Sequence, residues 1–208
     1  CGTFQVPFTE NFDSWPIATS TVPSIPNCWT EVDINGASGL SGRWNVRAAP
    51  TGTAYNGLLN GNVMQYNYWS TTAADDWIIT PGIEMTEGVT YQLDYAMGHN
   101  SGASYTEEVE VFAGTSASPA GMTESLADLT LTTTTANPYQ HFFTPTTTGT
   151  YYFGWHITSA INQFNVYIDD VSVEPVKNAS DCTCDQLEKG ESEMIFSRRG
   201  VTNARAAP

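Results

Sequence analysis

The chain has 208 residues, of which 22 are acidic and 7 are basic, so its formal net charge is −15 at neutral pH. This length allows one substantial hydrophobic core. The shortage of Lys and Arg argues against a nucleic-acid partner, because a phosphate-binding surface needs clustered bases. No stretch approaches the ~20 apolar residues of a membrane-spanning helix, so we predict no membrane span.

The charge is unevenly distributed along the chain. Residues 1–175 contain two bases, Arg43 and Arg47, whereas residues 176–208 contain five bases and five acids. The whole net charge of −15 therefore belongs to the first segment. This change in composition predicts a domain over residues 1–175 and a tail or linker over residues 176–208.

The predicted secondary structure consists of short strands separated by turns. Apolar residues alternate with polar ones in several of them, and Gly-containing turn signals such as Asn35-Gly36 and Pro81-Gly82 lie between them. In chain order the predicted strands are Thr3–Phe8, Trp29–Val32, Val63–Trp69, Trp77–Thr80, Tyr91–Met97, Val109–Ala113, Leu129–Thr134, Gln140–Thr144, Tyr151–Ile157 and Val166–Val173. This pattern predicts an all-β, antiparallel two-sheet jelly-roll sandwich, followed by a mostly irregular tail.

Sequence motifs of catalysis are absent: there is no G-x-S-x-G elbow, no H-E-x-x-H and no P-loop. Glu108 and Glu110 stand two apart on one strand, as glycosidase carboxylates can. However, Glu107, Glu108 and Glu110 also alternate with Val109 and Val111, which is typical of a solvated strand face. We therefore predict that the protein is not an enzyme, with a glycosidase as the weaker alternative.

Carboxylates are concentrated at both ends of the predicted domain. Glu10 and Asp13 lie near its start, and Asp169 and Asp170 lie near its end. The apolar residues that flank the Asp pair are three apart, which predicts a β-bulge there. In many sandwiches the first and last strands are neighbours, so these acids could meet around a calcium ion, which prefers six to eight oxygen ligands. The alternative is that each acid merely caps a turn.

Four cysteines, Cys1, Cys28, Cys182 and Cys184, allow three disulfide pairings. None of them has a Cys or His at zinc-finger spacing. Disulfide bonds in an oxidising compartment are the simplest interpretation, and they predict a secreted or cell-surface protein.

Several motifs resemble those of a known family. They occur in the order Cys1-Gly-Thr-Phe, Pro7-Phe-Thr-Glu-Asn-Phe-Asp13, Pro26-Asn-Cys-Trp29, Asp75-Asp-Trp-Ile-Ile-Thr-Pro81, Gly88-Val-Thr-Tyr-Gln-Leu93 and Tyr167-Ile-Asp-Asp-Val171. Over residues 1–175 the chain resembles the cleaved-adhesin family, which is related to the choice-of-anchor J and MAM-like jelly rolls of Bacteroidetes surface proteins. The resemblance implies a jelly-roll module of a secreted or surface-displayed protein that serves in adhesion or glycan binding.

The resemblance also implies roles for particular residues. The implied calcium ligands are Glu10, Asp13, Asp76, Asp169 and Asp170. Relatives often carry a D-x-D-G-type loop after the Cys-Trp strand, and this chain departs from that pattern, so a second calcium ion is not implied there.

The resemblance favours a disulfide between Cys1 and Cys28. Cys182 and Cys184 are then left to staple the tail elsewhere. Cys1-Gly2 also resembles the start of a mature lipoprotein, but the matching Cys28 favours the disulfide.

We predict a non-catalytic extracellular module that recognises protein or glycan surfaces and contains structural calcium. The alternatives are a carbohydrate-binding module of a secreted hydrolase, and a structural subunit whose tail contacts neighbouring modules or copies. Exposed aromatic side chains would supply a stacking platform for sugar. The candidates for this platform are Trp44, Tyr66, Tyr68, Trp69 and Tyr105.

Overall fold

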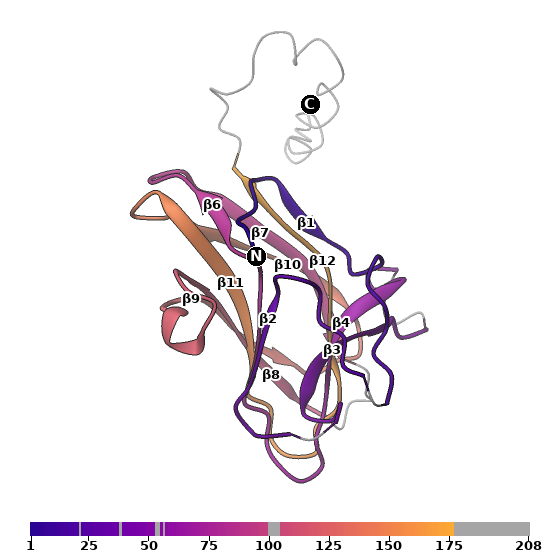
Figure 1. Cartoon of the computed structure of the whole chain (residues 1–208). Helices are drawn as coiled ribbons and strands as arrows, with labels where there is room; N and C mark the ends of the chain where they lie inside the picture. Colours follow the sequence, from indigo (N-terminus) through magenta and orange to yellow (C-terminus); the bar gives the residue numbers. More distant parts are fainter. Residues whose placement is uncertain (21, 38, 53–54, 56, 100–104, 177–208) are drawn as a thin grey trace, which may run out of the picture. The chain divides into compact units, whose positions relative to one another are not determined.

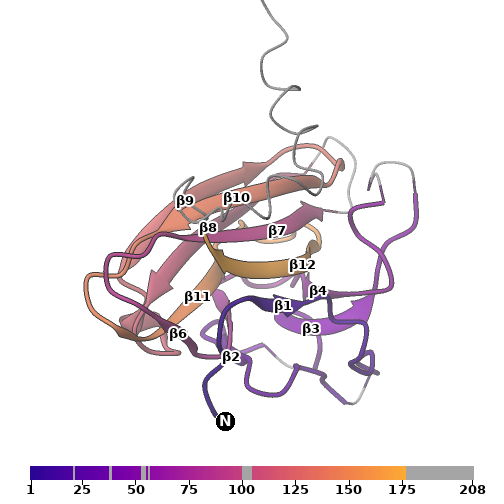
Figure 2. The same ribbon diagram turned by 90° about the horizontal axis from the view of Figure 1, so that it is seen from above.

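The computed structural model describes residues 1–20, 22–37, 39–52, 55, 57–99 and 105–176. In this part of the chain two antiparallel sheets face each other with the hydrophobic core between them (Figures 1 and 2). The first sheet has the order β10 (Asn137–Phe143), β7 (Tyr91–His99), β12 (Val166–Pro175), β4 (Asn62–Asn67) and β3 (Arg43–Ala48), and β1 (Phe8–Glu10) also pairs with β12. The second sheet has the order β2 (Thr30–Asp33), β5 (Asp76–Ile79), β11 (Gly149–Ile157), β8 (Glu107–Gly114) and β9 (Glu124–Leu131), and β6 (Ile83–Met85) also pairs with β11. The predicted antiparallel β-sandwich is therefore confirmed.

The described residues include one short 3-10 helix, η2 (Pro119–Gly121), and no helix among them is long and apolar enough to cross a membrane. The irregular tail and the fate of Cys182 and Cys184 lie outside the described residues, and they stay predictions, as does the domain boundary after residue 175.

Some strand boundaries differ from the prediction. The first strand is Phe8–Glu10 rather than Thr3–Phe8, because Phe4 forms only an isolated bridge to Ile83. β9 likewise begins earlier than predicted. Two strands, β3 and β6, were not predicted at all. β3 lacks a clean alternation because the polar Asn45 is as deeply buried as its apolar neighbours, and β6 is only three residues long.

The core is built from the alternating inward residues of both sheets. Its largest fully buried side chains include Trp44, Tyr66, Phe153 and Trp155. Trp29 stacks against Trp155 with ring centroids 6.3 Å apart. Burying such large aromatic surfaces supplies most of the hydrophobic stabilisation of a sandwich.

A second apolar cluster covers the opposite, outward face of the first sheet. Tyr55 and Leu59 pack there on Val63, Ala96 and Tyr167. Because successive residues of a strand point to opposite faces, Tyr167 joins this cluster while its neighbours in β12 enter the main core. The segment before β4 is thereby held against the first sheet.

Two local predictions are confirmed. The pairing of β12 with β7 changes register between Asp169 and Ser172, so the Asp pair lies at a bulge, and Asp170 has a φ of 49°. A disulfide joins Cys1 to Cys28, with Cα atoms 5.5 Å apart. It ties the start of the chain to the segment just before β2.

Candidate functional site

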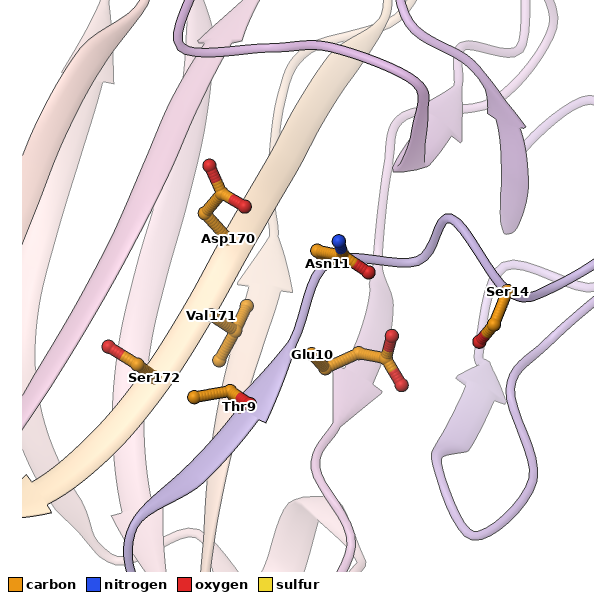
Figure 3. A pocket seen from close by; sticks show the side chains of 7 residues that line it. All are labelled: Thr9, Glu10, Asn11, Ser14, Asp170, Val171 and Ser172. Atoms are coloured by element: carbon orange, nitrogen blue, oxygen red, sulfur yellow. The ribbon is translucent and has the colours of Figure 1, made fainter.

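The first and last strands of the described domain are neighbours. β1 pairs antiparallel with β12, and Glu10 lies opposite Val171. The two acidic segments are thus brought together, as their positions in the sequence predicted. A depression of about 570 Å³ lies over this pair of strands, and Figure 3 shows the side chains that line it, among them Glu10, Asn11 and Asp170.

Asp13 and Asp169 hold the same short segment from two sides. The Oδ1 atom of Asp13 accepts the backbone N–H of Asn62 at 2.7 Å, and the Oδ2 atom of Asp169 accepts that of Asn60 at 3.0 Å. Asp169 is only 1% exposed. Burial raises the pKa of its carboxyl to about 7, and the negative charges of Asp170 and Asp13 raise it further, although the N–H groups of Asn60 and Asp170 lower it. No sequence pattern predicted the contribution of Asn60 and Asn62.

Glu10 and Asp170 are oriented differently from this pair. The carboxylate of Glu10 accepts the N–H of Phe12 at 2.7 Å and the indole N–H of Trp15 at 3.0 Å. Asp170 is exposed, and its carboxylate and that of Glu10 point in different directions (Figure 3). Strand pairing therefore brings the backbones of these two residues together without joining their side chains.

Asp76 belongs to a different cluster, so the five predicted ligands do not form one site. It lies on β5 in the second sheet and accepts hydrogen bonds from Asn35 at 2.6 Å and Tyr66 at 3.1 Å. Burial raises the pKa of the Asp76 carboxyl to about 7. Similarity of motif order carries no information on which sheet a residue occupies, so it could not show that Asp76 lies apart from the other four residues.

Asp13 and Asp169 suit a calcium ion only if main-chain oxygens complete the coordination. Among the described residues no three His, Cys, Asp or Glu side chains are arranged to hold a metal ion. Carboxylates and carbonyls together are the ligands that calcium prefers. Neither Arg43 nor Arg47, the two bases of the domain, is hydrogen-bonded to Asp13 or Asp169. Arg43 pairs with Glu31, and Arg47 donates to the carbonyl of Ala18.

Two of the five predicted platform residues are not available to a ligand. Trp44 is 0% exposed and Tyr66 is 1% exposed, so both are core residues, because β3 and β4 point them inward. Tyr68, Trp69 and Tyr105 are half-buried. Tyr68 and Tyr105 pack on Phe164, with ring centroids 4.8 and 5.6 Å apart. Tyr68 and Tyr105 therefore belong to an aromatic cluster around Phe164.

A groove that the sequence analysis missed runs along the first sheet. It has a volume of about 390 Å³ and joins polar groups of Asp94, Gln140 and Asp170 with apolar surface of Leu58, Pro138 and Tyr139. The amide of Gln140 donates to Asp94 across β10 and β7 at 3.0 Å. Asp94 and Gln140 occupy the polar positions of alternating strands, so their pattern marks them only as outward-facing, and their pairing across β7 and β10 comes from the strand register.

The prediction that Glu107, Glu108 and Glu110 form one solvated face of β8 is wrong for Glu107. Its side chain is 0% exposed, whereas that of Glu108 is exposed. Glu107 is in phase with Val109 and Val111, which belong to the core. The period of two therefore indicated an inward Glu107, although the prediction treated the three glutamates as one exposed group.

Glu110 is engaged by a histidine. His156 lies between Glu110 and Asp75, with each ring nitrogen 2.8 Å from a carboxylate oxygen, and its ring stacks on Trp77 at 4.3 Å. Glu110 is therefore a structural partner of His156. Nothing in this arrangement favours the glycosidase alternative.

Comparison with known proteins identifies the fold. No family model matches the sequence, and no curated protein matches it either. The K1 cleaved adhesin domain of Lys-gingipain from Porphyromonas gingivalis W83 is similar in structure, with a TM-score of 0.62 and 17% identity over 83% of this chain and 99% of that domain. The CBM22-1 xylan-binding domain of Xyn10C from Paenibacillus barcinonensis has a TM-score of 0.53 and 10% identity, over 86% of this chain and 100% of that domain.

The K2 cleaved adhesin domain of Lys-gingipain is also similar, with a TM-score of 0.58 and 17% identity over 81% of this chain and 99% of that domain. At these identities the likeness concerns the fold. The chain folds as a β-sandwich of the kind found in cleaved adhesin domains, which is the fold that its sequence motifs implied.

Proposed function

We propose that this protein is a non-catalytic, extracellular binding module that recognises glycan surfaces through the groove on its first sheet. The groove carries the proposal, because it combines two kinds of surface that a sugar ring needs. Leu58 and Pro138 offer apolar area, while Asp94 and Gln140 offer acceptors and a donor. Binding sites for small polar ligands are mostly apolar, with a few fixed polar groups that set orientation.

The polar groups of the groove are already held in place. Asp94 accepts hydrogen bonds from Gln140 of the neighbouring strand and from Gln92 of its own strand. A preorganised group loses little conformational entropy when a ligand binds. Similar folds include a domain described as xylan-binding and domains described as cleaved adhesins, which supports a binding rather than a catalytic role.

Calcium is the proposed structural component of the module. Asp13 and Asp169, together with main-chain oxygens, would hold it next to the paired first and last strands. The ion would neutralise the buried Asp169 and the neighbouring Asp170, which otherwise repel each other at the bulge. The Cys1–Cys28 disulfide supports a location outside the reducing cytosol.

A binding screen of the full chain tests the function. The chain is applied to a glycan array and to a panel of extracellular matrix proteins, and the affinity of any glycan hit is measured by calorimetry. Because Asp94 and Gln140 would each donate or accept a ligand hydrogen bond, Asp94→Ala and Gln140→Ala should each weaken glycan binding by about tenfold. Asp128→Ala is the matched control, since Asp128 is an exposed acid on β9 of the second sheet.

Three results would contradict the proposal. These are the absence of any glycan hit, equal affinity of the groove variants and wild type, or an equal loss in Asp128→Ala. Binding to a matrix protein without any glycan would instead establish protein adhesion as the function.

A further inference from the structure

A small, partly open cavity lies beside Tyr68 and Trp69, which follow β4. Its volume is about 10 Å³, close to what a single water molecule occupies. Its polar lining comes from Glu107, Tyr66, Thr72, Ser159 and Gln163. The cavity is separate from the groove and from the Asp13–Asp169 pair, with which it shares no lining residue.

Glu107 has one carboxylate oxygen without a partner inside this lining. Its Oε1 atom accepts the backbone N–H of Phe164, whereas its Oε2 atom is buried and makes no hydrogen bond. Burial raises the pKa of the Glu107 carboxyl to about 7, although hydrogen bonds from the hydroxyl of Ser159 and the N–H of Phe164 partly lower this pKa. A buried carboxyl group is stable when it is protonated, or when its charge is paired or coordinates a metal ion. The ionised form of Glu107 would therefore lack a partner at its Oε2 atom.

Neutral oxygens of the lining are fixed by their own hydrogen bonds. The hydroxyl of Ser159 accepts the N–H of Glu108 at 2.9 Å, and the amide oxygen of Gln163 accepts the N–H of Thr106 at 2.8 Å. The hydroxyl of Tyr66 donates to Asp76 at 3.1 Å and accepts from the amide of Asn35 at 3.5 Å. Hydroxyl, amide and carboxylate oxygens are the ligands of hard cations.

We propose that Glu107, with the neutral oxygens of Ser159, Gln163 and Thr72, binds one hard cation in this cavity. Calcium and sodium share this chemistry, and both are abundant outside cells. The fully buried Asp76, behind Tyr66, adds to the negative potential of the site. The alternative occupant is a water molecule beside a protonated Glu107, and the cation dependence measured below distinguishes the two.

The experiment uses the full chain after treatment with a chelator. The melting temperature is measured in choline chloride at constant ionic strength, and then with calcium chloride or sodium chloride in its place. All variants carry Asp169→Asn, so that the calcium site proposed above makes no contribution. Glu107→Gln removes the charge at nearly constant shape, and Glu108→Gln is the matched control, because it removes the neighbouring exposed charge of the same strand.

The expected result is a cation-dependent rise in the melting temperature that persists with Glu108→Gln and is lost with Glu107→Gln. If calcium is the ion, equilibrium dialysis shows one bound calcium ion fewer per chain in Glu107→Gln than in Glu108→Gln. If sodium is the ion, sodium chloride raises the melting temperature and the number of bound calcium ions is the same in both variants. The proposal is overturned if neither cation shifts the melting temperature, or if Glu107→Gln responds as Glu108→Gln does.

Glu107→Gln could fail to fold, which near-ultraviolet circular dichroism would reveal. Thr72→Val then replaces it, because valine keeps the shape of threonine and removes only a neutral oxygen. We expect Thr72→Val to lower the cation affinity by about three- to tenfold. An unchanged affinity in Thr72→Val would overturn the proposal.

Discussion

The carboxyl group of Asp169 allows a quantitative prediction about stability and pH. Burial places its pKa at about 7 in the folded protein, against a value of 3.8 for an unperturbed group. A raised pKa means that the folded state binds the proton more tightly than the unfolded state does. The stability gained in this way is complete below about pH 4 and is lost as the pH rises to about 7. With about 1.4 kcal/mol per pKa unit, the loss amounts to roughly 4 kcal/mol.

The replacement Asp169→Asn isolates this contribution. We expect the unfolding free energy of the wild type in EDTA to fall between about pH 4 and pH 8 by roughly 4 kcal/mol more than that of the variant. Urea titrations followed by tryptophan fluorescence at each pH measure both. In the variant, the NH2 group of asparagine replaces one carboxylate oxygen, so the N–H of either Asn60 or Asp170 loses its acceptor, which costs about 1–3 kcal/mol. That cost is independent of pH, so it shifts the profile of the variant without changing its slope.

Calcium should suppress the pH dependence of the wild type. A bound ion favours the ionised carboxylate, so the fall in stability between acid and neutral pH becomes smaller when calcium replaces EDTA. Parallel profiles of wild type and Asp169→Asn in EDTA would refute the reasoning about burial. Identical profiles of the wild type in EDTA and in calcium would refute the proposed calcium site.

Two further predictions concern stability. The Cys1–Cys28 disulfide closes a loop with a sequence separation of 27, so replacing both cysteines with serine should destabilise the protein by about 3–4 kcal/mol in guanidinium titrations; an unchanged midpoint would contradict this. Gly114→Ala places a methyl group against the backbone carbonyl of Gly121 and should cost about 1–3 kcal/mol by thermal unfolding. Gly149→Ala is its control, because a methyl group there meets no atom within 4 Å, and equal effects of the two variants would count against the argument.

Local patterns in the sequence were sufficient to predict the fold class. Alternation of apolar and polar residues marks β7, β8 and β11, because successive side chains of a strand point to opposite faces. The break in this alternation at Asp169 and Asp170 predicted the bulge for the same reason. The ordered motifs predicted the kind of sandwich and the Cys1–Cys28 disulfide.

The tertiary structure alone decided which of the polar residues lie together. Asp76 and Asp169 are both aspartates that follow or precede apolar strand residues, and the sequence does not distinguish them. In the structure they occupy different sheets and have different hydrogen-bond partners. Asp169 accepts a hydrogen bond from the backbone N–H of Asn60, which lies more than a hundred residues earlier in the sequence. The groove forms because β10 pairs with β7, although a long segment of chain separates these two strands. Pairing between distant strands depends on the packing of the whole core. A local pattern can therefore show that a carboxylate points inward, as for Glu107, but it cannot show which residues surround that carboxylate.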